Sequence, residues 1–201
     1  MGGKLSAEES LRQSHALSGG EIKKIMFKDK KNCRIMLYEE LGRLQNGRDL
    51  FKMLRAYNGI FILYPTIGKT VGHWTLLYKV PEMERIVFFD PYGKVGKKML
   101  FPDQELMWNK SGIKYPPYLS KLLLEYPHDL EFSEYPFQKD VDKDTGVQIS
   151  TCGRWCCYRL MCNKMNEKEF IHHVKHYCKQ MDMTPDEYVT YITDEVLNES
   201  G

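Results

Sequence analysis

The sequence predicts an α+β domain in which a mixed, mainly antiparallel sheet is flanked by helices. Two apolar, β-rich runs at residues 74–80 and 85–91 are separated by a short polar connection, a pattern typical of a β-hairpin. Two helical patterns, at residues 152–163 and 167–179, follow later in the chain. Strands followed by a block of helices, without regular alternation, indicate the α+β class.

Composition favours a single domain. With 201 residues, 42% of them hydrophobic, the chain is long enough to bury a core and too short for two large domains. We expect residues 1–20 to be a flexible N-terminal segment and residues 21–201 to form the one domain. The net charge of +2 is too small to indicate nucleic-acid binding, although residues 23–34 are locally basic.

The chain lacks the patterns of membrane or secreted proteins. No stretch approaches the roughly 20 apolar residues of a membrane span, and no signal-peptide segment stands near the start. Most of the six cysteines fall within residues 152–162, on one predicted helix, which does not resemble a secreted disulfide framework. We therefore expect a non-secreted protein in a reducing compartment.

The remaining elements follow from local patterns along the chain. The leucines of residues 119–123 have helical spacing, and Thr184-Pro185-Asp186-Glu187 is typical of a helix start. Helices are expected at residues 21–27, 49–57, 116–126, 152–163, 167–179 and from Thr184 onward. Strands are expected at residues 59–64, 74–80, 85–91 and 129–137. Residues 139–146, rich in Asp and Lys, are expected to be a solvated loop.

Cys152 stands where a predicted loop becomes a helix, and it is followed by Gly153. At the start of a helix, unpaired backbone N–H groups and the helix dipole favour the thiolate over the thiol. A thiolate is the form of cysteine that attacks carbonyl carbon. The sequence therefore predicts a nucleophile at Cys152.

The predicted hairpin brings a histidine and a carboxylate together. His73 opens the first run and Asp90 closes the second, so antiparallel pairing places both at one end of the hairpin. His73 can then take the proton of Cys152, while Asp90 accepts a hydrogen bond from the other ring nitrogen and orients the imidazole. Gln148 and the backbone N–H of Cys152 are the predicted donors to the oxyanion.

Three motifs in this order resemble the cysteine protease superfamily of adenain, the adenovirus maturation protease, and the SUMO-specific proteases. They are Gly72-His73-Trp74, then Phe88-Phe89-Asp90-Pro91-Tyr92-Gly93, then Gln148-Ile149-Ser150-Thr151-Cys152-Gly153. The Thr-Cys-Gly-Arg-Trp-Cys form is most similar to the versions in virophages, Polinton-type elements and large DNA viruses. The resemblance covers residues 17–177, and the interval from Gln148 to Cys152 is shorter than in many members of the superfamily.

The resemblance implies an adenain-like, papain-like cysteine protease fold with the nucleophile at the N-terminus of a central helix. It also implies a viral maturation protease that cleaves capsid or virion precursors after Gly-Gly, with Trp74 closing over the substrate backbone. The expected location is the virion and the host cytoplasm. We expect a monomer without a cofactor. Whether a peptide or DNA activates it is left open, and the sequence does not predict DNA dependence.

Two other functions fit parts of the sequence. The same motifs allow an isopeptidase that acts on SUMO or another ubiquitin-like modifier. A zinc-binding module is the alternative that is not an enzyme, because cysteines and histidines cluster late in the chain, although no Cys-x-x-Cys knuckle is present. The residues concerned are Cys152, Cys156, Cys157, Cys162, His172, His173, His176 and Cys178.

The N-terminal region carries two further hypotheses. Leu17-Ser18-Gly19-Gly20 before Glu21 resembles the Leu-x-Gly-Gly sites of the adenain branch, so the protein could cleave itself after Gly20. Met1-Gly2-Gly3-Lys4-Leu5-Ser6 matches the pattern for N-myristoylation at Gly2, which would bring the protein into contact with membranes.

Overall fold

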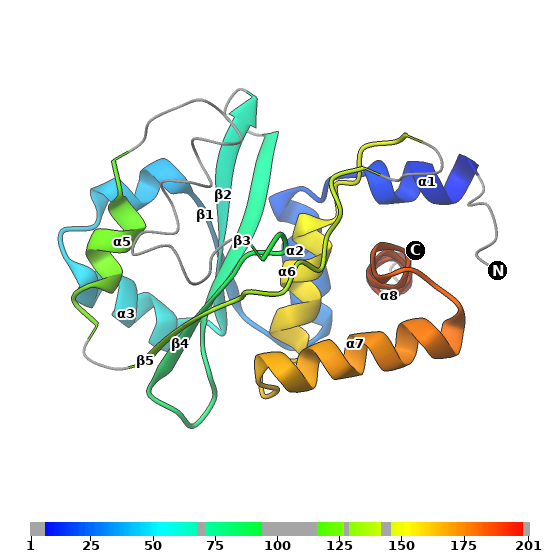
Figure 1. The fold of residues 1–201 in the computed structure, drawn as a ribbon. Helices are drawn as coiled ribbons and strands as arrows, with labels where there is room; N and C mark the ends of the chain where they lie inside the picture. The colour runs from blue at the N-terminus through cyan, green and yellow to red at the C-terminus, as the bar shows by residue number, and fades with distance from the viewer. Residues whose placement is uncertain (1–6, 68–70, 94–115, 127–128, 142–145, 199–201) are drawn as a thin grey trace.

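One five-stranded sheet with helices on both faces forms the centre of the computed structural model, which describes residues 7–67, 71–93, 116–126, 129–141 and 146–198 (Figure 1). The strands lie side by side in chain order: β1 (Cys33–Leu37), β2 (Gly59–Ile67), β3 (Val71–Lys79), β4 (Arg85–Phe89) and β5 (Asp129–Phe132). The central pairs β2–β3 and β3–β4 are antiparallel, and both outer strands join in parallel. The sheet is therefore mixed, as predicted.

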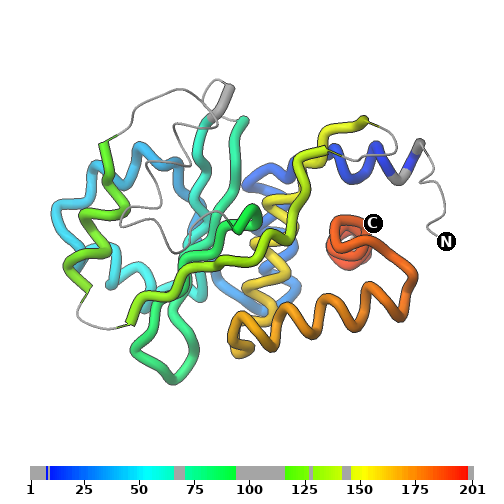
Figure 2. Tube along the Cα trace, in the orientation of Figure 1, coloured from blue at the N-terminus to red at the C-terminus, as the bar shows by residue number. Residues whose placement is uncertain are grey.

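The helices form two layers, one on each face of the sheet (Figure 1). One layer holds the short helices η1 (Tyr38–Arg43), α3 (Gly47–Ala56) and α5 (Tyr118–Leu123). The other holds α2 (Gly19–Lys28), α6 (Cys152–Met161), α7 (Glu167–Met181) and α8 (Pro185–Asn198). In Figure 2, the N-terminal helix α1 (Ala7–Ser14) lies on the same side of the sheet as the C-terminal helix α8, which it contacts.

The apolar runs of the strands are continuous because both faces of the sheet are buried. Alternate residues of β2 enter different cores: Phe61 packs toward α6 and Ile62 toward the opposite layer. The same alternation separates Leu76 from Leu77 in β3. The sheet thus gives α6 a fixed apolar surface on which to pack.

The predicted hairpin is confirmed by the register of β3 and β4. Leu76 pairs with Phe89, so the first half of β3 extends beyond the end of β4. His73 and Asp90 therefore meet at one end of the hairpin, as the antiparallel pairing predicts.

The N-terminal segment differs from the expectation that residues 1–20 are flexible. Residues 7–14 form α1, Leu17 is buried, and Gly19 and Gly20 open α2. The polar side chains of Ser10 and Gln13 are buried too, which a hydrophobic pattern does not reveal. Part of this segment is therefore helical, and the buried positions of α1 that the structure describes are polar.

The strand expected at residues 129–137 ends at Phe132, since Ser133 turns to hydrogen-bond the backbone of Asp90. Gly2, the predicted myristoylation site, lies outside the described residues. Within the described ranges, none of the helices has the length and apolar character needed to cross a lipid bilayer.

Candidate active site

His73 lies in β3 at a point where the backbones of β2 and β3 approach each other closely. Gly72, directly before it, pairs with Pro65 of β2, and a Cβ at Gly72 would lie only 2.0 Å from the carbonyl oxygen of Tyr64. Only glycine fits there without displacing backbone. The imidazole of His73 is 4% exposed, so the ring direction is set by packing and hydrogen bonds.

Asp90 orients this imidazole. Its Oδ1 lies 2.7 Å from Nε2 of His73 and also accepts the backbone N–H of Tyr92 at 3.0 Å. The backbone of Asp90 is fixed by Ser133, whose Oγ accepts the N–H at 2.8 Å and donates to the carbonyl at 3.0 Å. With Nε2 directed to Asp90, the ring leaves Nδ1 for proton exchange with a nucleophile.

The turn after Asp90, at residues 90–93, places an aromatic ring against His73. The ring of Tyr92 packs on the imidazole with centroids 4.7 Å apart. Gly93 has φ of +60° and donates its N–H to the carbonyl of Asp90 at 2.9 Å. A Cβ at Gly93 would stand 2.4 Å from the backbone of Tyr135, so this turn needs glycine.

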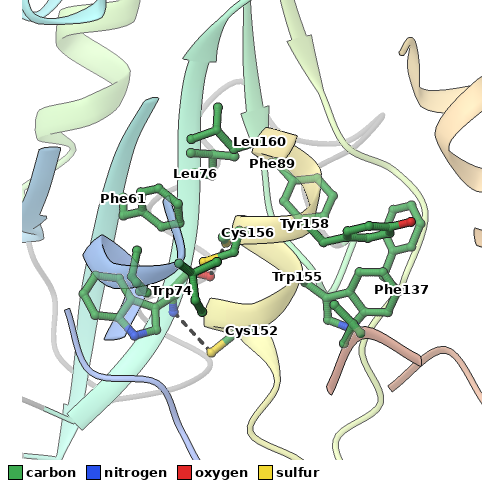
Figure 3. Close-up of a cluster of buried hydrophobic side chains, with 14 of the residues drawn as sticks. Phe61, Trp74, Leu76, Phe89, Phe137, Cys152, Trp155, Cys156, Tyr158 and Leu160 are labelled. Atoms are coloured by element: carbon green, nitrogen blue, oxygen red, sulfur yellow. Dashed lines mark hydrogen bonds between the residues drawn. The ribbon is translucent and has the colours of Figure 1, made fainter. Parts of the chain in front are cut away.

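Cys152 is the first residue of α6, as the sequence predicted. Its Sγ accepts the backbone N–H of Trp74 at 3.5 Å, which Figure 3 shows as a dashed line, and its thiol interacts with the imidazole of His73. Gly153 lets the helix approach closely, because a Cβ there would meet Trp74 at 3.1 Å and Leu17 at 3.2 Å. The structure therefore brings Cys152, His73 and Asp90 together.

The electrostatics favour a thiolate and an imidazolium. Burial alone would raise the pKa of Cys152, but the hydrogen bond and positive charge of His73, with the N–H groups of Trp74 and Gly153, lower it below its usual value. For His73, burial lowers the pKa, yet the charge and hydrogen bond of Asp90 raise it to about 9. At neutral pH the pair is arranged as a nucleophile beside a proton donor.

Gln148 lies at the surface, four residues before Cys152. It is exposed, and its backbone forms an isolated bridge with Val141. In the described parts of the chain, no hydrogen bond joins its side chain to Cys152.

Gln138, which the sequence analysis did not single out, is buried nearby. Its amide Nε2 donates to Tyr92 Oη at 3.2 Å and to the carbonyl of Ile149 at 3.1 Å. It thus contacts both the residue packed on His73 and the segment before Cys152. The sequence around Gln138 does not indicate this position, because residues distant in the chain, Tyr92 and Ile149, form its contacts.

Trp74 is a fixed part of the site. It is 5% exposed, and its indole Nε1 donates to the carbonyl of Leu17 at 2.9 Å. The same N-terminal segment binds the loop before the nucleophile, since Ser150 donates its backbone N–H to the carbonyl of Gln13 at 2.9 Å. The predicted role of Trp74 in covering a substrate stays a prediction, but the ring is anchored by the chain itself.

The other helical cysteines are in apolar surroundings. Cys156 and Cys157 are fully buried, and burial raises the pKa of each thiol well above its usual value. In the described part of the chain, His, Cys, Asp and Glu side chains do not gather in groups of three or more that could hold a metal ion. The zinc alternative therefore finds no support in the geometry.

Comparison with known proteins places the chain in a virophage family. No protein-family model matches it. The chain is 36% identical over 183 residues to the uncharacterized protein V9 of the Sputnik virophage, covering 89% of this chain and 94% of that protein. The chain belongs to the family of this virophage protein.

Solved structures with a similar backbone include two proteases. The ASFV pS273R protease has a TM-score of 0.49 and 13% identity, covering 90% of this chain and 68% of that one. The SUMO protease Ulp1, solved with its catalytic cysteine oxidized to a sulfinic acid, has a TM-score of 0.36 and 12% identity, covering 96% and 98%.

Proposed function

We propose that this protein is a cysteine endopeptidase in which Cys152 is the nucleophile, His73 the general acid and base, and Asp90 the group that orients His73. The observation that carries the proposal is the buried constellation itself. A cysteine with lowered pKa begins a helix, and a histidine with raised pKa lies between it and a buried carboxylate. Catalytic groups are arranged in this way when a thiolate must attack at neutral pH.

The reaction follows from the positions of these groups. The Cys152 thiolate attacks the scissile carbonyl carbon, and the tetrahedral oxyanion accepts the backbone N–H of Cys152 and a glutamine amide. His73 gives its proton to the leaving amine, which leaves a thioester on Cys152. His73 then takes a proton from water, the hydroxide attacks the thioester, and collapse of this second intermediate releases the carboxylic acid and the Cys152 thiolate.

The glutamine that serves the oxyanion has two candidates. Gln148 is the residue that the superfamily resemblance implies, and it is exposed four residues before Cys152. Gln138 is buried beside the His73 support, and its Nε2 would have to exchange its hydrogen bond to Tyr92 or to Ile149 for one to the oxyanion. We retain Gln148 as the proposed donor, with Gln138 as its competitor.

For the substrate, we propose capsid or virion precursor proteins with Gly-Gly-x sites. The support is the resemblance of the three motifs to adenain-type proteases and the membership in a virophage protein family. A buried Trp74 beside His73 is also in keeping with a narrow cleft that accepts glycine better than larger side chains. The virion and the host cytoplasm are the locations that this role implies.

The test is cleavage of a panel of Leu-x-Gly-Gly-x peptides and a SUMO fusion by wild type and Cys152→Ala. Cys162→Ala is the matched control, because Cys162 lies at the far end of the same helix. We expect peptide cleavage by wild type and the control, and none by Cys152→Ala. Release of SUMO would instead favour the isopeptidase. Equal cleavage by Cys152→Ala and wild type would refute the proposal. The same assay with added DNA or a substrate-derived peptide tests whether either one activates the enzyme.

A further inference from the structure

Asp186 is a buried carboxylate that the proposed chemistry does not use. It lies in the first turn of α8, and it is 2% exposed. Burying a carboxylate is costly unless hydrogen bonds replace water. Asp186 accepts three of them, and all three come from segments of the site.

Two of these hydrogen bonds fix the start of the nucleophile helix. Thr151, directly before Cys152, donates its Oγ1 to Asp186 Oδ1 at 2.6 Å. Trp155, one turn further along α6, donates its indole Nε1 to the same oxygen at 3.0 Å. Thr151 is the N-cap residue of α6, yet its hydroxyl makes no bond to the helix's own backbone. Its side chain instead ties the helix start to α8.

The third hydrogen bond reaches the segment beside the histidine. The backbone N–H of Lys139 donates to Asp186 Oδ2 at 3.1 Å. Its neighbour Gln138 donates its own N–H to the carbonyl of Pro91 at 3.0 Å, directly after Asp90. One carboxylate therefore joins the residue before the nucleophile to the segment that packs behind the His73–Asp90 pair.

The position of Asp186 in α8 suits a carboxylate that must stay in place. The N-terminal end of a helix stabilises negative charge, and Thr184 with Glu187 forms reciprocal capping hydrogen bonds there. Further along α8, Arg154 of α6 donates to Thr193 at 2.6 Å and pairs with Asp194 at 2.7 Å. Helix α6 is thus held against α8 at several points, and the hydrogen bond from Thr151 to Asp186 is the one made by the residue directly before Cys152.

We propose that Asp186 is a positioning residue that holds the first turn of α6, and with it the Cys152 thiolate, in reach of His73. The inference rests on the proposed role of Cys152 as nucleophile. Asp186 touches neither the sulfur nor the imidazole, so it acts through Thr151, Trp155 and Lys139. Its loss changes the alignment of the Cys152–His73 pair and thereby the reactivity of the thiolate.

The test measures the rate at which iodoacetamide alkylates Cys152 as a function of pH, quantified on the Cys152 peptide by mass spectrometry. Thr151→Val removes one hydrogen bond at constant shape, and Thr151→Ser restores the hydroxyl. Asp186→Asn leaves one acceptor oxygen in place of two, so the side chain can no longer accept both from Lys139 and from the Thr151–Trp155 pair. Thr190→Val is the control, because Thr190 is also buried on α8 and its Oγ1 has no partner among the described residues.

We expect Thr151→Val and Asp186→Asn to slow alkylation at pH 7 at least tenfold and to move its midpoint to higher pH. Thr151→Ser and Thr190→Val should keep the wild-type profile. Folded Thr151→Val with an unchanged profile overturns the inference, even where Asp186→Asn does not fold. A wild-type Cys152 that alkylates with the pH profile of an ordinary thiol overturns the proposed function itself, so the two failures are distinguishable.

Discussion

The first and second turns of α6 each hold a cysteine that is hydrogen-bonded to the backbone of Trp74, yet the pKa values of the two thiols shift in opposite directions. Cys152 accepts the backbone N–H of Trp74, whereas Cys156 donates its S–H to the carbonyl of Trp74, each at 3.5 Å (Figure 3). Both side chains are buried, so burial raises the pKa of both thiols. Only Cys152 also has His73 and the free N–H groups of the helix start, and its pKa falls instead.

The comparison shows that hydrogen-bond donors and nearby charge, rather than residue type or burial, separate the proposed nucleophile from a core cysteine. Cys152 and Cys156 are one helical turn apart, and over that distance the backbone group facing the sulfur changes from an N–H donor to a carbonyl acceptor.

The largest effect is expected from His73→Ala. The substitution removes both the proton donor and the charge that lowers the pKa of Cys152, so we expect peptide cleavage to fall by about 10³-fold or more. The midpoint for alkylation of Cys152 should rise toward that of Cys156. Steady-state kinetics and pH-dependent alkylation measure the two effects. Unchanged reactivity of Cys152 in this variant would show that the helix start alone makes the thiolate.

Asp90→Asn should have a smaller effect that is visible in the pH profile. In wild type, activity rises as Cys152 ionises below its usual pKa and falls as His73 loses its proton at about 9. The variant lacks the charge that raises the pKa of His73, so the alkaline limb should move to lower pH. The acid limb should move up, because a neutral His73 no longer favours the thiolate.

For Asp90→Asn, we expect kcat/KM to fall by roughly 10²-fold or more. Measured from pH 5 to 10, its bell-shaped pH profile should be narrower than that of wild type. Asp194→Asn is a suitable control, since that carboxylate pairs with Arg154 instead. A profile of wild-type width in Asp90→Asn would contradict the assigned role of Asp90.

The oxyanion donor is tested by comparing Gln148→Ala with Gln138→Ala. Removing a donor of this kind typically lowers kcat by about 10²- to 10³-fold with little change in KM. We expect that loss in Gln148→Ala. The same loss in Gln138→Ala, with a nearly normal Gln148→Ala, would transfer the role to Gln138. Thermal unfolding of both variants separates catalysis from stability, because Gln138 is buried and Gln148 is exposed.

The sequence could predict the parts of the site that depend on local patterns. His73 and Asp90 belong to neighbouring strands joined by a short turn, and Cys152 follows directly from the start of an apolar helix. The alternating strands and their short turn predict the positions of His73 and Asp90, and the start of the apolar helix predicts that of Cys152. None of these predictions needs contacts between distant parts of the chain.

The remaining parts depend on contacts between segments far apart in the chain. Asp186 reaches Thr151 from α8, and Leu17 reaches Trp74 from the N-terminal segment. Strand β1 was not predicted, because the exposed Arg34 interrupts its short apolar pattern. Polar residues that pack through tertiary hydrogen bonds carry no periodic signal, and this is why α1 and Gln138 were missed as well.

Self-cleavage after Gly20 illustrates the same limit. Local sequence resembles a Gly-Gly site, but Ser18 and Glu21 form a capping box and Gly20 lies in the first turn of α2. The bond after Gly20 is therefore helical in the folded protein. Cleavage there would require the start of α2 to unwind and enter a site as extended chain.

The most direct test of the thiolate–imidazolium account is covalent labelling with a Leu-Ser-Gly-Gly peptide that ends in a vinyl methyl ester. Mass spectrometry of wild type and His73→Ala then identifies which cysteine is modified. The account predicts one adduct on Cys152 in wild type, none on Cys156 and none in His73→Ala. No adduct, an adduct on another cysteine, or equal labelling of Cys152 without His73 would contradict it.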